Sequence, residues 1–239
     1  MITFLKWDSD FFGKKIARIT VKTDCTTNEL DQIINKFFQK DYDCGYLVIP
    51  SETDNLVDYC LSKHYFLADK KAVLKKESKT FKIKRLFEVK TQVSTDKLGK
   101  LRELSHQIAE TSRFFKDPNF RPYAFKLYET WISESIKKNK CFFIFESGIP
   151  IGLITLKVID NNPYIDLFGV DKLYRKRGIG TMLLEIADTW AKDNGYNNIF
   201  VTTQADNNIA FLVYKKHGFR PEKMTRIFHI WRKYDKNPL

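Results

Sequence analysis

The sequence predicts a mixed α/β fold made of two units, a small one over residues 1–78 and a larger one over residues 79–239. Two observations support this prediction. First, 43% of the 239 residues are hydrophobic and 15% are aromatic, which is enough apolar material for a buried core in one large or two small domains. Second, short apolar segments with strand character alternate with amphipathic helical segments. Between the units, segment 76–84, "KESKTFKIK", has few large apolar residues and indicates a linker or an edge strand.

The first unit is predicted to alternate between strands and helices. Runs of β-branched and aromatic residues indicate strands, and apolar residues three and four positions apart indicate helices. In order, we expect a strand at 14–21, a helix at 27–40, a strand at 45–50, a helix at 54–65 and a strand at 71–76.

The second unit is predicted to begin with a strand at 85–89 and two helices, at 94–110 and 123–139. Between the helices, residues 111–122, "TSRFFKDPNFRP", are rich in aromatic residues, arginine and proline, and predict a loop. Three antiparallel strands are expected within 141–170, because "SGIP" and "DNNP" are turn sequences. The remaining elements are a helix at 181–195, a strand at 197–203, a helix at 207–218 and a strand at 226–234.

Two segments of the chain, 46–66 and 199–219, resemble each other without a gap. This similarity indicates an internal repeat, with chance as the alternative. A repeat predicts that the first unit is a degenerate half of the fold of the second. The first unit would lack the chemistry of the second, because it has no glycine motif and carries Leu61 where the second has Tyr214. The identical pairs include Val48/Val201, Asn55/Asn208, Lys63/Lys216, His64/His217 and Phe66/Phe219.

The composition limits the partners of the protein. A formal net charge of +12 favours an anionic partner, which could be nucleic acid, a membrane surface or a phosphorylated small molecule. The lysines form no clear stripe and the aromatic residues no RNA-binding signature, so we expect no nucleic acid partner. The apolar runs are far shorter than the roughly 18 residues of a membrane span, and the first residues lack the apolar middle of a signal peptide. We therefore expect a soluble, cytoplasmic protein without a membrane partner.

Cysteine usage predicts no metal centre. Cys25, Cys44, Cys60 and Cys141 are scattered, without a CxxC pair and without a histidine at zinc-ligand spacing. We expect all four to be reduced and structural.

The segment 174–190, "YRKRGIGTMLLEIADTW", places three basic side chains and two glycines directly ahead of an amphipathic helix. A helix N-terminus directs unpaired backbone N–H groups toward one point, where the helix dipole also favours negative charge. Gly178 and Gly180 allow the backbone to approach a ligand closely, and the basic residues supply countercharge. The spacing R-x-x-G-x-G matches neither the Walker nor the dinucleotide motif. The segment therefore predicts a phosphate site, with a plain helix-capping turn as the alternative.

These residues resemble the GCN5-related N-acetyltransferase (GNAT) superfamily, in which a strand leads into an R/Q-x-x-G-x-G/A turn that binds the pyrophosphate of acyl-coenzyme A. The segment 167–184, "LFGVDKLYRKRGIGTMLL", fits that pattern and departs from it at Lys172, where proline is common. The segment 207–219, "NNIAFLVYKKHGF", matches N-x-x-A-x-x-x-Y-x-x-x-G-F. Because both motifs occur in the right order and separation, residues 140–232 are similar to a GNAT acyltransferase.

The resemblance implies a role for each motif residue. Phe168 and Val170 would offer backbone groups to the pantetheine arm, and Asn207 would contact the coenzyme near the thioester. Tyr214 would act as general acid and protonate the departing thiolate. Acetyl-CoA or a longer acyl-CoA, such as 3-hydroxybutyryl-CoA, is the implied co-substrate, and no metal is expected. The pyrophosphate would bind the turn formed by Arg175, Lys176, Arg177, Gly178, Ile179, Gly180 and Thr181.

Nearly the whole chain also resembles the dTDP-fucosamine acetyltransferase group, through "LKWDSDFFGKKIARI", "TSRFFKDPNF", "LYETWI" and "VTTQADNNIAFLVY". Members of this group acylate an amino group on a nucleotide-linked amino-deoxysugar, for O-antigen or capsule synthesis in bacteria. The resemblance implies a dTDP-linked 3- or 4-amino-dideoxyhexose as acceptor. The aromatic content, at 15%, favours a homodimer. A dTDP-sugar carries two phosphates, which suits a basic surface with aromatic residues nearby.

The acceptor residues are predicted within the aromatic segment after the first helix of the second unit. Arg113 and Arg121 would bind phosphate or sugar hydroxyls, and Phe114 or Phe115 would contact an apolar sugar face; ordinary packing is the alternative for these rings. Trp7 and Phe11 are included through the resemblance of "WDSDFFG", although core packing is the commoner role of such residues.

The acceptor amine must lose a proton before it attacks. Asp166, His106 and a water chain are the candidate bases, and direct attack in a ternary complex is favoured because neither motif contains a cysteine. Two alternatives stay open. The same fold could acylate a protein amine or another small-molecule amine, or the positive charge could mark a nucleic-acid-binding module.

Overall fold

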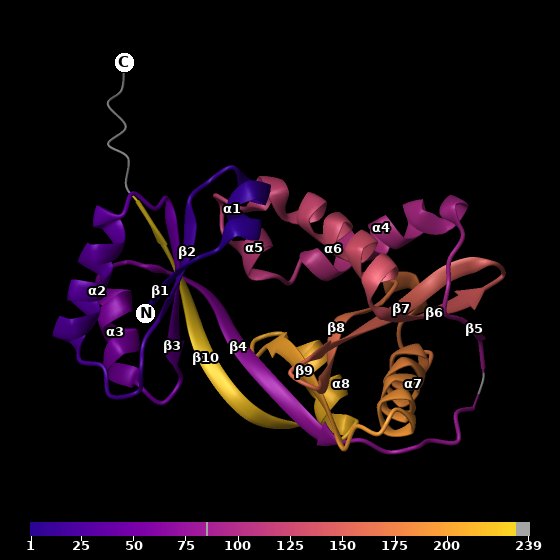
Figure 1. Cartoon of the computed structure of the whole chain (residues 1–239). Helices are drawn as coiled ribbons and strands as arrows, with labels where there is room; N and C mark the ends of the chain where they lie inside the picture. The colour runs from indigo at the N-terminus through magenta and orange to yellow at the C-terminus, as the bar shows by residue number, and fades with distance from the viewer. Residues whose placement is uncertain (85, 233–239) are drawn as a thin grey trace. The chain divides into compact units, whose positions relative to one another are not determined.

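The computed structural model of the chain describes residues 1–84 and 86–232 and confirms a mixed α/β architecture (Figure 1). It divides into two compact units. Unit 1 contains Met1–Lys71 together with residues 224–232, and unit 2 contains Ala72–Lys223. The division differs from the predicted boundary after residue 78, because the last strand pairs with a strand of the first unit.

Unit 1 is a five-stranded sheet with the strand order β1-β2-β3-β10-β4. Strands β2 and β3 are parallel, whereas β1 with β2 and β10 with β3 are antiparallel. Helix α2 buries Leu30, Ile34 and Phe37, spaced four and three residues apart, against the apolar cluster of this sheet. The elements are β1 (Ile2–Phe4), α1 (Lys6–Phe12), β2 (Ile16–Thr20), α2 (Thr27–Gln39), β3 (Cys44–Pro50), α3 (Asp54–Ser62), the first half of β4 (Phe66–Glu77) and most of β10 (Arg220–Trp231).

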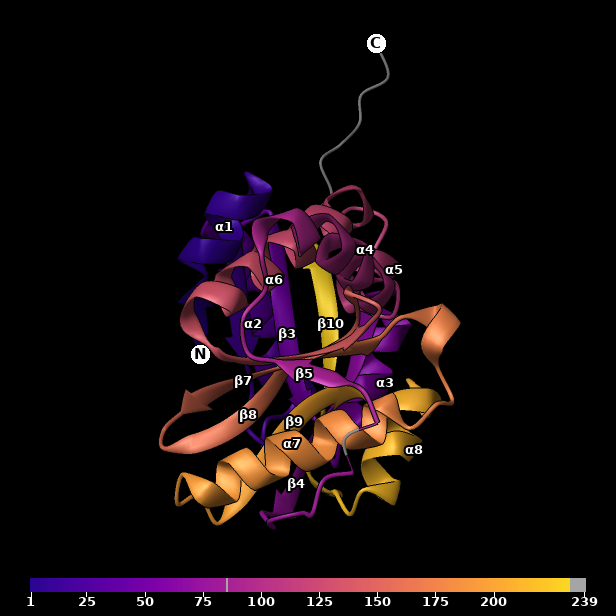
Figure 2. The ribbon, with the colours of Figure 1, turned by 90° about the vertical axis from the view of Figure 1, so that its right-hand side faces the viewer.

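Unit 2 continues from β4 with the strand order β4-β9-β8-β7-β6-β5. Helices α4 and α6 cover one face of this sheet, and α7 and α8 cover the other (Figures 1 and 2). The elements are β5 (Glu88–Lys90), η1 (Thr95–Lys97), α4 (Leu98–Ala109), α5 (Arg113–Lys116), η2 (Arg121–Tyr123), α6 (Ala124–Lys138), β6 (Lys140–Glu146), β7 (Ile149–Ile159), β8 (Asn162–Val170), η3 (Lys172–Tyr174), α7 (Ile179–Asp193), β9 (Asn198–Gln204) and α8 (Asn208–Lys216).

The segment predicted as a loop at 111–122 contains short helical turns. Helix α5 forms because the Ser112 hydroxyl accepts the backbone N–H of Phe115 at 3.2 Å, a helix N-cap. The buried carboxylate of Asp117 accepts the N–H of Asn119 at 2.9 Å and ends α5 in a turn. The segment shows no helical periodicity of apolar residues, and its aromatic residues and prolines are typical of a loop, so the sequence pattern did not predict these hydrogen bonds.

The two similar sequence segments fold alike. The run β3-α3-β4 and the run β9-α8-β10 have elements of equal length, at 7, 9 and 12 residues. The last strand of each run crosses the unit boundary: β4 ends in unit 2, and β10 ends in unit 1. The structure therefore agrees with the repeat that the sequence predicts.

The predicted linker after β4 forms backbone hydrogen bonds with α7 and with the segment that follows α7. The Ser78 N–H donates to the carbonyl of Asn197 at 2.9 Å, the Lys79 N–H to Asp188 Oδ1 at 3.1 Å and the Phe81 N–H to Thr189 Oγ1 at 3.0 Å. These bonds leave the segment little freedom and connect β4 to the helix that begins at the glycine turn.

A buried ion pair lies beneath this segment. Lys76 Nζ bonds Asp188 Oδ2, with the aspartate fully buried and His217 Nε2 3.5 Å away. Burial alone would raise the pKa of Asp188, but hydrogen bonds from His217, Lys76 and the Lys79 amide outweigh it and hold the pKa below the usual range. The pair therefore stabilises the folded state at neutral pH, and this contribution is lost as the pH falls below about 4.

None of the helices in the described part of the chain combines the length and the apolar character that a membrane span requires.

We expect Asp188→Asn to lower the free energy of unfolding by about 3–5 kcal/mol, because it leaves the Lys76 ammonium buried without a counter-charge. Urea unfolding followed by circular dichroism at pH 7 measures the change. Asp10→Asn is the control, since the Lys6–Asp10 pair is exposed and its loss should cost at most about 1 kcal/mol. Equal stability of the two variants would contradict the prediction.

Candidate functional site

The turn between β8 and α7 requires two residues with positive φ. Gly178 is the N-cap of α7 at φ +80°, and Lys176 has φ +62°. Glycine adopts this region without strain, whereas an L side chain does not. The next residue, Ile179, is 1% exposed and fixes the start of α7 in the core. The chain therefore reverses sharply at the surface and enters the helix with its first amides near the turn.

Among the described residues, no side chain caps the N-terminus of α7. Gly178 has no side chain to cap the helix, and the first turn holds no acidic residue. By contrast, α2 of unit 1 carries a capping box, in which the Glu29 N–H donates to Thr26 Oγ1 at 3.2 Å and the Thr26 N–H donates to Glu29 Oε2 at 2.7 Å. A capped, acidic terminus repels an anion, and an uncapped one attracts it. Of these two helices, α7 is therefore the one suited to phosphate.

The three basic residues of the turn differ in their partners. Arg175 Nε donates to the carbonyl of Val170 at 3.1 Å, and Lys176 is exposed without a carboxylate in reach among the described residues. Arg177 forms a two-point pair with Glu146, at 3.1 and 2.5 Å, and lies over the ring of Tyr174. The sequence predicted all three as countercharge, but the structure shows Arg177 already neutralised by Glu146.

Strands β8 and β9 are paired over a short stretch. Their parallel register comprises Tyr164 with Phe200 and Ile165 with Val201. In unit 1, β2 and β3 pair over five positions, from Ile16 with Cys44 to Thr20 with Val48. The equivalent opening is therefore closed in unit 1, whereas in unit 2 the last residues of β8 lack partners in β9.

The backbone of Phe168 and Val170 faces the β9 side of β8. The N–H of Leu167 donates to Thr155 Oγ1, and the N–H of Asp171 donates to the carbonyl of Ile151, so alternate residues from 167 to 171 bond β7. Because backbone groups alternate in direction along a strand, Phe168 and Val170 direct theirs away from β7. Apart from the Val170 carbonyl, which accepts Arg175 Nε at 3.1 Å, these groups can bind an extended ligand by adding to the edge of β8.

Tyr214 meets this strand from α8. Its side chain is 4% exposed, and its ring centroid lies 5.7 Å from Phe168 and 5.6 Å from Phe219. Burial raises the pKa of Tyr214 above its ordinary value, so the phenol keeps its proton at neutral pH. Asn207 caps α8, because its Oδ1 accepts the Ala210 N–H at 3.2 Å. The glycine turn and the second motif are thus brought together at Phe168.

Helix α4 supports the start of the turn, which sequence reasoning did not anticipate. Lys100 Nζ lies 2.9 Å from Asp171 Oδ2, and Lys172 Nζ lies 2.7 Å from Glu110 Oε2. The Lys172 N–H also donates to Gln107 Oε1 at 2.9 Å. Lys172, which replaces the common proline, is therefore tied to α4. These pairs join residues more than 60 positions apart, so periodicity carries no signal for them.

Asp166 lies in a different environment from Tyr214. A bulge opposite Thr155 interrupts the alternation of β8, and the Asp166 carboxylate accepts bonds from Ser135 at 3.2 Å and Asn139 at 3.4 Å. It also pairs with Lys157 Nζ. The Asp166 carboxylate is therefore held by one cation and two hydrogen-bond donors.

The aromatic segment from Arg113 to Tyr123 divides into packed and accessible residues. Phe114 is 5% exposed and packs against Phe120 and Trp131, so it belongs to the core. Phe115 is half-buried, with the Arg121 guanidinium 4.7 Å above its ring. Arg113 lies over Phe114 at 4.6 Å.

This segment is tied to the second motif. Lys116 Nζ lies 2.9 Å from Asp206 Oδ2, and Asp206 directly precedes Asn207. Phe115 and Arg121 are therefore held near the N-terminus of α8.

Trp7 and Phe11 belong to unit 1. They lie one helical turn apart on α1, and their rings stack with centroids 5.4 Å apart. Trp7 is 40% exposed, so part of its ring is accessible. Their place in a sugar site stays a prediction.

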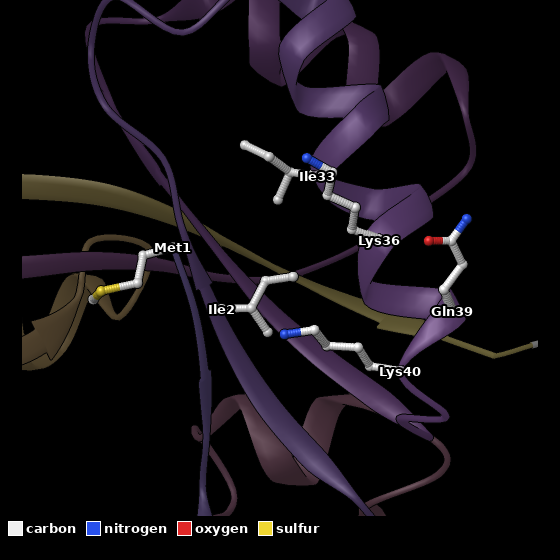
Figure 3. A pocket seen from close by; sticks show the side chains of 6 residues that line it. All are labelled: Met1, Ile2, Ile33, Lys36, Gln39 and Lys40. Atoms are coloured by element: carbon white, nitrogen blue, oxygen red, sulfur yellow. The ribbon is translucent and has the colours of Figure 1, made fainter.

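Unit 1 contains a separate apolar pocket of about 310 Å³ between β1 and α2 (Figure 3). Figure 3 shows the side chain of Lys40, the residue after α2, extending toward Ile2. The pocket contains none of the residues predicted for the site. Its lining consists of Met1, Ile2, Ile33, Lys36, Gln39 and Lys40.

Comparisons with known proteins agree with this geometry. The model of the Acetyltransferase (GNAT) family matches residues 105–219. Streptothricin acetyltransferase A of Bacillus subtilis is 33% identical over 110 residues, which cover 46% of this chain and 63% of that protein. The matched segments span 26% to 63% of the length of the curated relatives.

Solved structures share the fold at low sequence identity. A GCN5-related N-acetyltransferase from Sphaerobacter thermophilus has a TM-score of 0.65 at 11% identity, over 96% of this chain and 76% of that one. PaiA N-acetyltransferase from Thermoplasma acidophilum, in complex with coenzyme A, has a TM-score of 0.50 at 19% identity, over 61% of this chain and 99% of that one.

The matched segment contains both motifs, the opening beside β8 and Tyr214. The mixed sheet and the GNAT resemblance predicted from the sequence are confirmed, whereas the finer resemblance to the dTDP-fucosamine group stays a prediction. Over residues 105–219, the chain is therefore similar to the acetyltransferases of the GNAT family.

Proposed function

We propose that the protein transfers an acyl group from acyl-CoA to the amino group of a dTDP-linked 3- or 4-amino-dideoxyhexose. The observation that carries the proposal is the convergence on Phe168 of an uncapped helix N-terminus and a buried tyrosine. The helix N-terminus suits a diphosphate, and the tyrosine can act as a general acid at the other end of an extended ligand.

The residues present fit acyl-CoA as co-substrate. The pyrophosphate would bind the amides from Gly178 to Thr181, with Arg175 and Lys176 as countercharge. Because Arg177 is paired with Glu146, we assign it to holding the turn. The pantetheine arm would bond the backbone of Phe168 and Val170, and Asn207 would lie near the thioester.

The reaction would proceed by direct attack within a ternary complex. The neutral amine attacks the acyl carbonyl and forms a C–N bond, and the C–S bond of the thioester then breaks. The Tyr214 phenol would give its proton to the departing thiolate, and its apolar surroundings keep that proton in place before the reaction.

The acceptor is inferred from charge and aromatic surface. The chain carries a net charge of +12, and Phe115 with Arg121 offers a flat apolar face beside a cation next to the loop before α8. A sugar ring and a phosphate have these complementary properties. We omit Phe114 from this surface because it is buried.

A second acceptor class has its own support. The similarity to Streptothricin acetyltransferase A favours a cationic antibiotic amine as acceptor. Such a ligand would need carboxylates near the amine, and Glu129 beside His106 is one such group on α6. The two classes differ in charge, so they can be separated by experiment.

We expect Gly178→Ala to weaken coenzyme A binding at least about tenfold, because displacing the turn costs one charge-assisted hydrogen bond or more. Pantetheine, which lacks the pyrophosphate, should bind the variant and the wild type alike. Titration calorimetry with both ligands measures the effect. Gly195→Ala is the matched control, since Gly195 lies at the other end of α7 with φ +81°. Equal loss of coenzyme A binding in both variants would contradict the assignment of the turn at Gly178 to the pyrophosphate.

We expect Tyr214→Phe to lower kcat by about 10² or more, because the acid is lost while the ring contacts remain. Thiol release from acetyl-CoA and 3-hydroxybutyryl-CoA is measured with dTDP-linked 3-amino- and 4-amino-6-deoxysugars, streptothricin and a peptide amine. Tyr164→Phe is the control, because Tyr164 stacks on Phe200 in the same unit. Turnover of streptothricin or the peptide but of no sugar would overturn the proposed acceptor.

We also expect kcat to stay level on the alkaline side up to about pH 10, the ordinary tyrosine pKa. Burial raises the pKa of Tyr214, so the acid form that the reaction needs persists to higher pH than in an exposed tyrosine. A pH profile of kcat with saturating substrates measures this. A fall that begins near pH 8 would show that another group supplies the proton.

A further inference from the structure

A histidine and a glutamate form a pair on the helices α4 and α6. His106 Nε2 lies 2.7 Å from Glu129 Oε1, and their side chains are 32% and 26% exposed. Because a carboxylate accepts hydrogen bonds, Nε2 carries the hydrogen of this contact. The lone pair is then left on Nδ1, for which the described residues provide no partner. The pair is thus oriented and partly accessible to a ligand.

The pair lies on the aromatic surface proposed for the acceptor. The His106 ring stacks on Phe125 with centroids 4.5 Å apart, and Phe125 lies 5.5 Å from Phe115. Arg121 covers the ring of Phe115. Imidazole, aromatic rings and a guanidinium therefore form one continuous patch across α4, α5 and α6.

Two independent contacts connect this patch to the residues around Tyr214. On α4, the side chain of Ile108, two residues after His106, fills the space at Gly169, where a Cβ would lie 2.8 Å from its carbons. Gly169 adjoins Phe168. On α5, Lys116 binds Asp206 beside Asn207. Helix α4 and the segment that carries Phe115 are therefore fixed to β8 and to the loop between β9 and α8.

We propose that His106 is the base that removes the proton from the acceptor ammonium, with Glu129 as the positioning residue. This assignment rests on the proposed acyl transfer. The N–H bond of the ammonium breaks and an Nδ1–H bond forms. The neutral amine then joins the acyl carbon, the thiolate takes the proton of Tyr214, the second amine proton returns to Tyr214 through solvent, and the imidazolium releases its proton to solvent.

The charged surroundings favour His106 over Asp166 for this step. Asp166 already pairs with Lys157 and accepts two hydrogen bonds. Glu129 faces the imidazole directly and stabilises the imidazolium that forms, as a carboxylate does for a histidine base. Lys126 on α6 lies 3.9 Å from Glu129. The other charged groups on the packed elements are Lys100, Arg102 and Glu103 on α4, Arg113 and Lys116 on α5, Arg121 on η2, and Glu134, Lys137 and Lys138 on α6.

The test is the pH profile of kcat/KM for acetyl transfer to the amino-deoxysugars. In the wild type, kcat/KM should fall at acid pH as the base becomes protonated. His106→Gln keeps a hydrogen-bond donor for Glu129 but cannot take the proton. We therefore expect kcat/KM at the plateau to fall by about 10², and the decrease of kcat/KM at acid pH to disappear. In His106→Gly, added imidazole should restore part of the rate.

Glu129→Gln separates positioning from folding. Removing the carboxylate charge destabilises the imidazolium, so the acid limb should move to lower pH with a smaller loss at the plateau. His64→Gln, an exposed histidine of unit 1, is the control and should leave the profile unchanged. All variants should bind coenzyme A as the wild type does.

The outcomes distinguish this proposal from the proposed function. If the wild type acylates a sugar and Tyr214→Phe is impaired, an unchanged profile in His106→Gln overturns the histidine base and leaves the function standing. If the profile changes but Glu129→Gln leaves the acid limb in place, the role of Glu129 is overturned. If the wild type acylates no sugar, the acceptor is wrong, and the assignment made for its amine is overturned with it.

Discussion

The separation of β8 from β9 is the constraint on which the site depends. Their ladder comprises two residue pairs, and beyond Ile165 the backbone of β8 is paired with β7 but not with β9. A bulge opposite Thr155 lies where β8 separates from β9. The threonine hydroxyl accepts the N–H of Leu167, which the bulge displaces from its regular partner. Unpaired backbone groups are costly unless something bonds them. The fold thus leaves a row of hydrogen-bonding groups for a ligand, ending at the uncapped first turn of α7.

Unit 1 shows what the same chain elements do without this opening. Its β2 and β3 stay paired over five positions, and α2 satisfies its first amides with Thr26 and Glu29. The helix and strand lengths of the repeated run are otherwise equal in the two units. A closed ladder and a capped helix are thus two local differences that leave the shared architecture in place. This is consistent with a repeat of which one copy retains the chemistry.

The charges of unit 2 are divided between the scaffold and the ligand. Lys100, Lys172 and Arg177 each pair with a carboxylate and hold the turn in place. Lys176 lacks such a partner among the described residues and stays available to an anion. Tyr214, in contrast, lies among aromatic rings, where burial keeps its proton. The cationic end and the neutral end of the site are thus separated along β8, as a ligand with a charged and an apolar end requires.

The sequence by itself determined most of the helices and strands, the glycine turn and the two motifs. These depend on residues close together in the chain: apolar periodicity, the left-handed backbone at Gly178 and the spacing of Asn207 from Tyr214. The tertiary structure decided which candidates meet. It placed Phe114 in the core and exchanged the last strands between the units. It also brought His106 to Glu129. Contacts between residues distant in the chain follow from how helices and strands pack, and no local pattern encodes them.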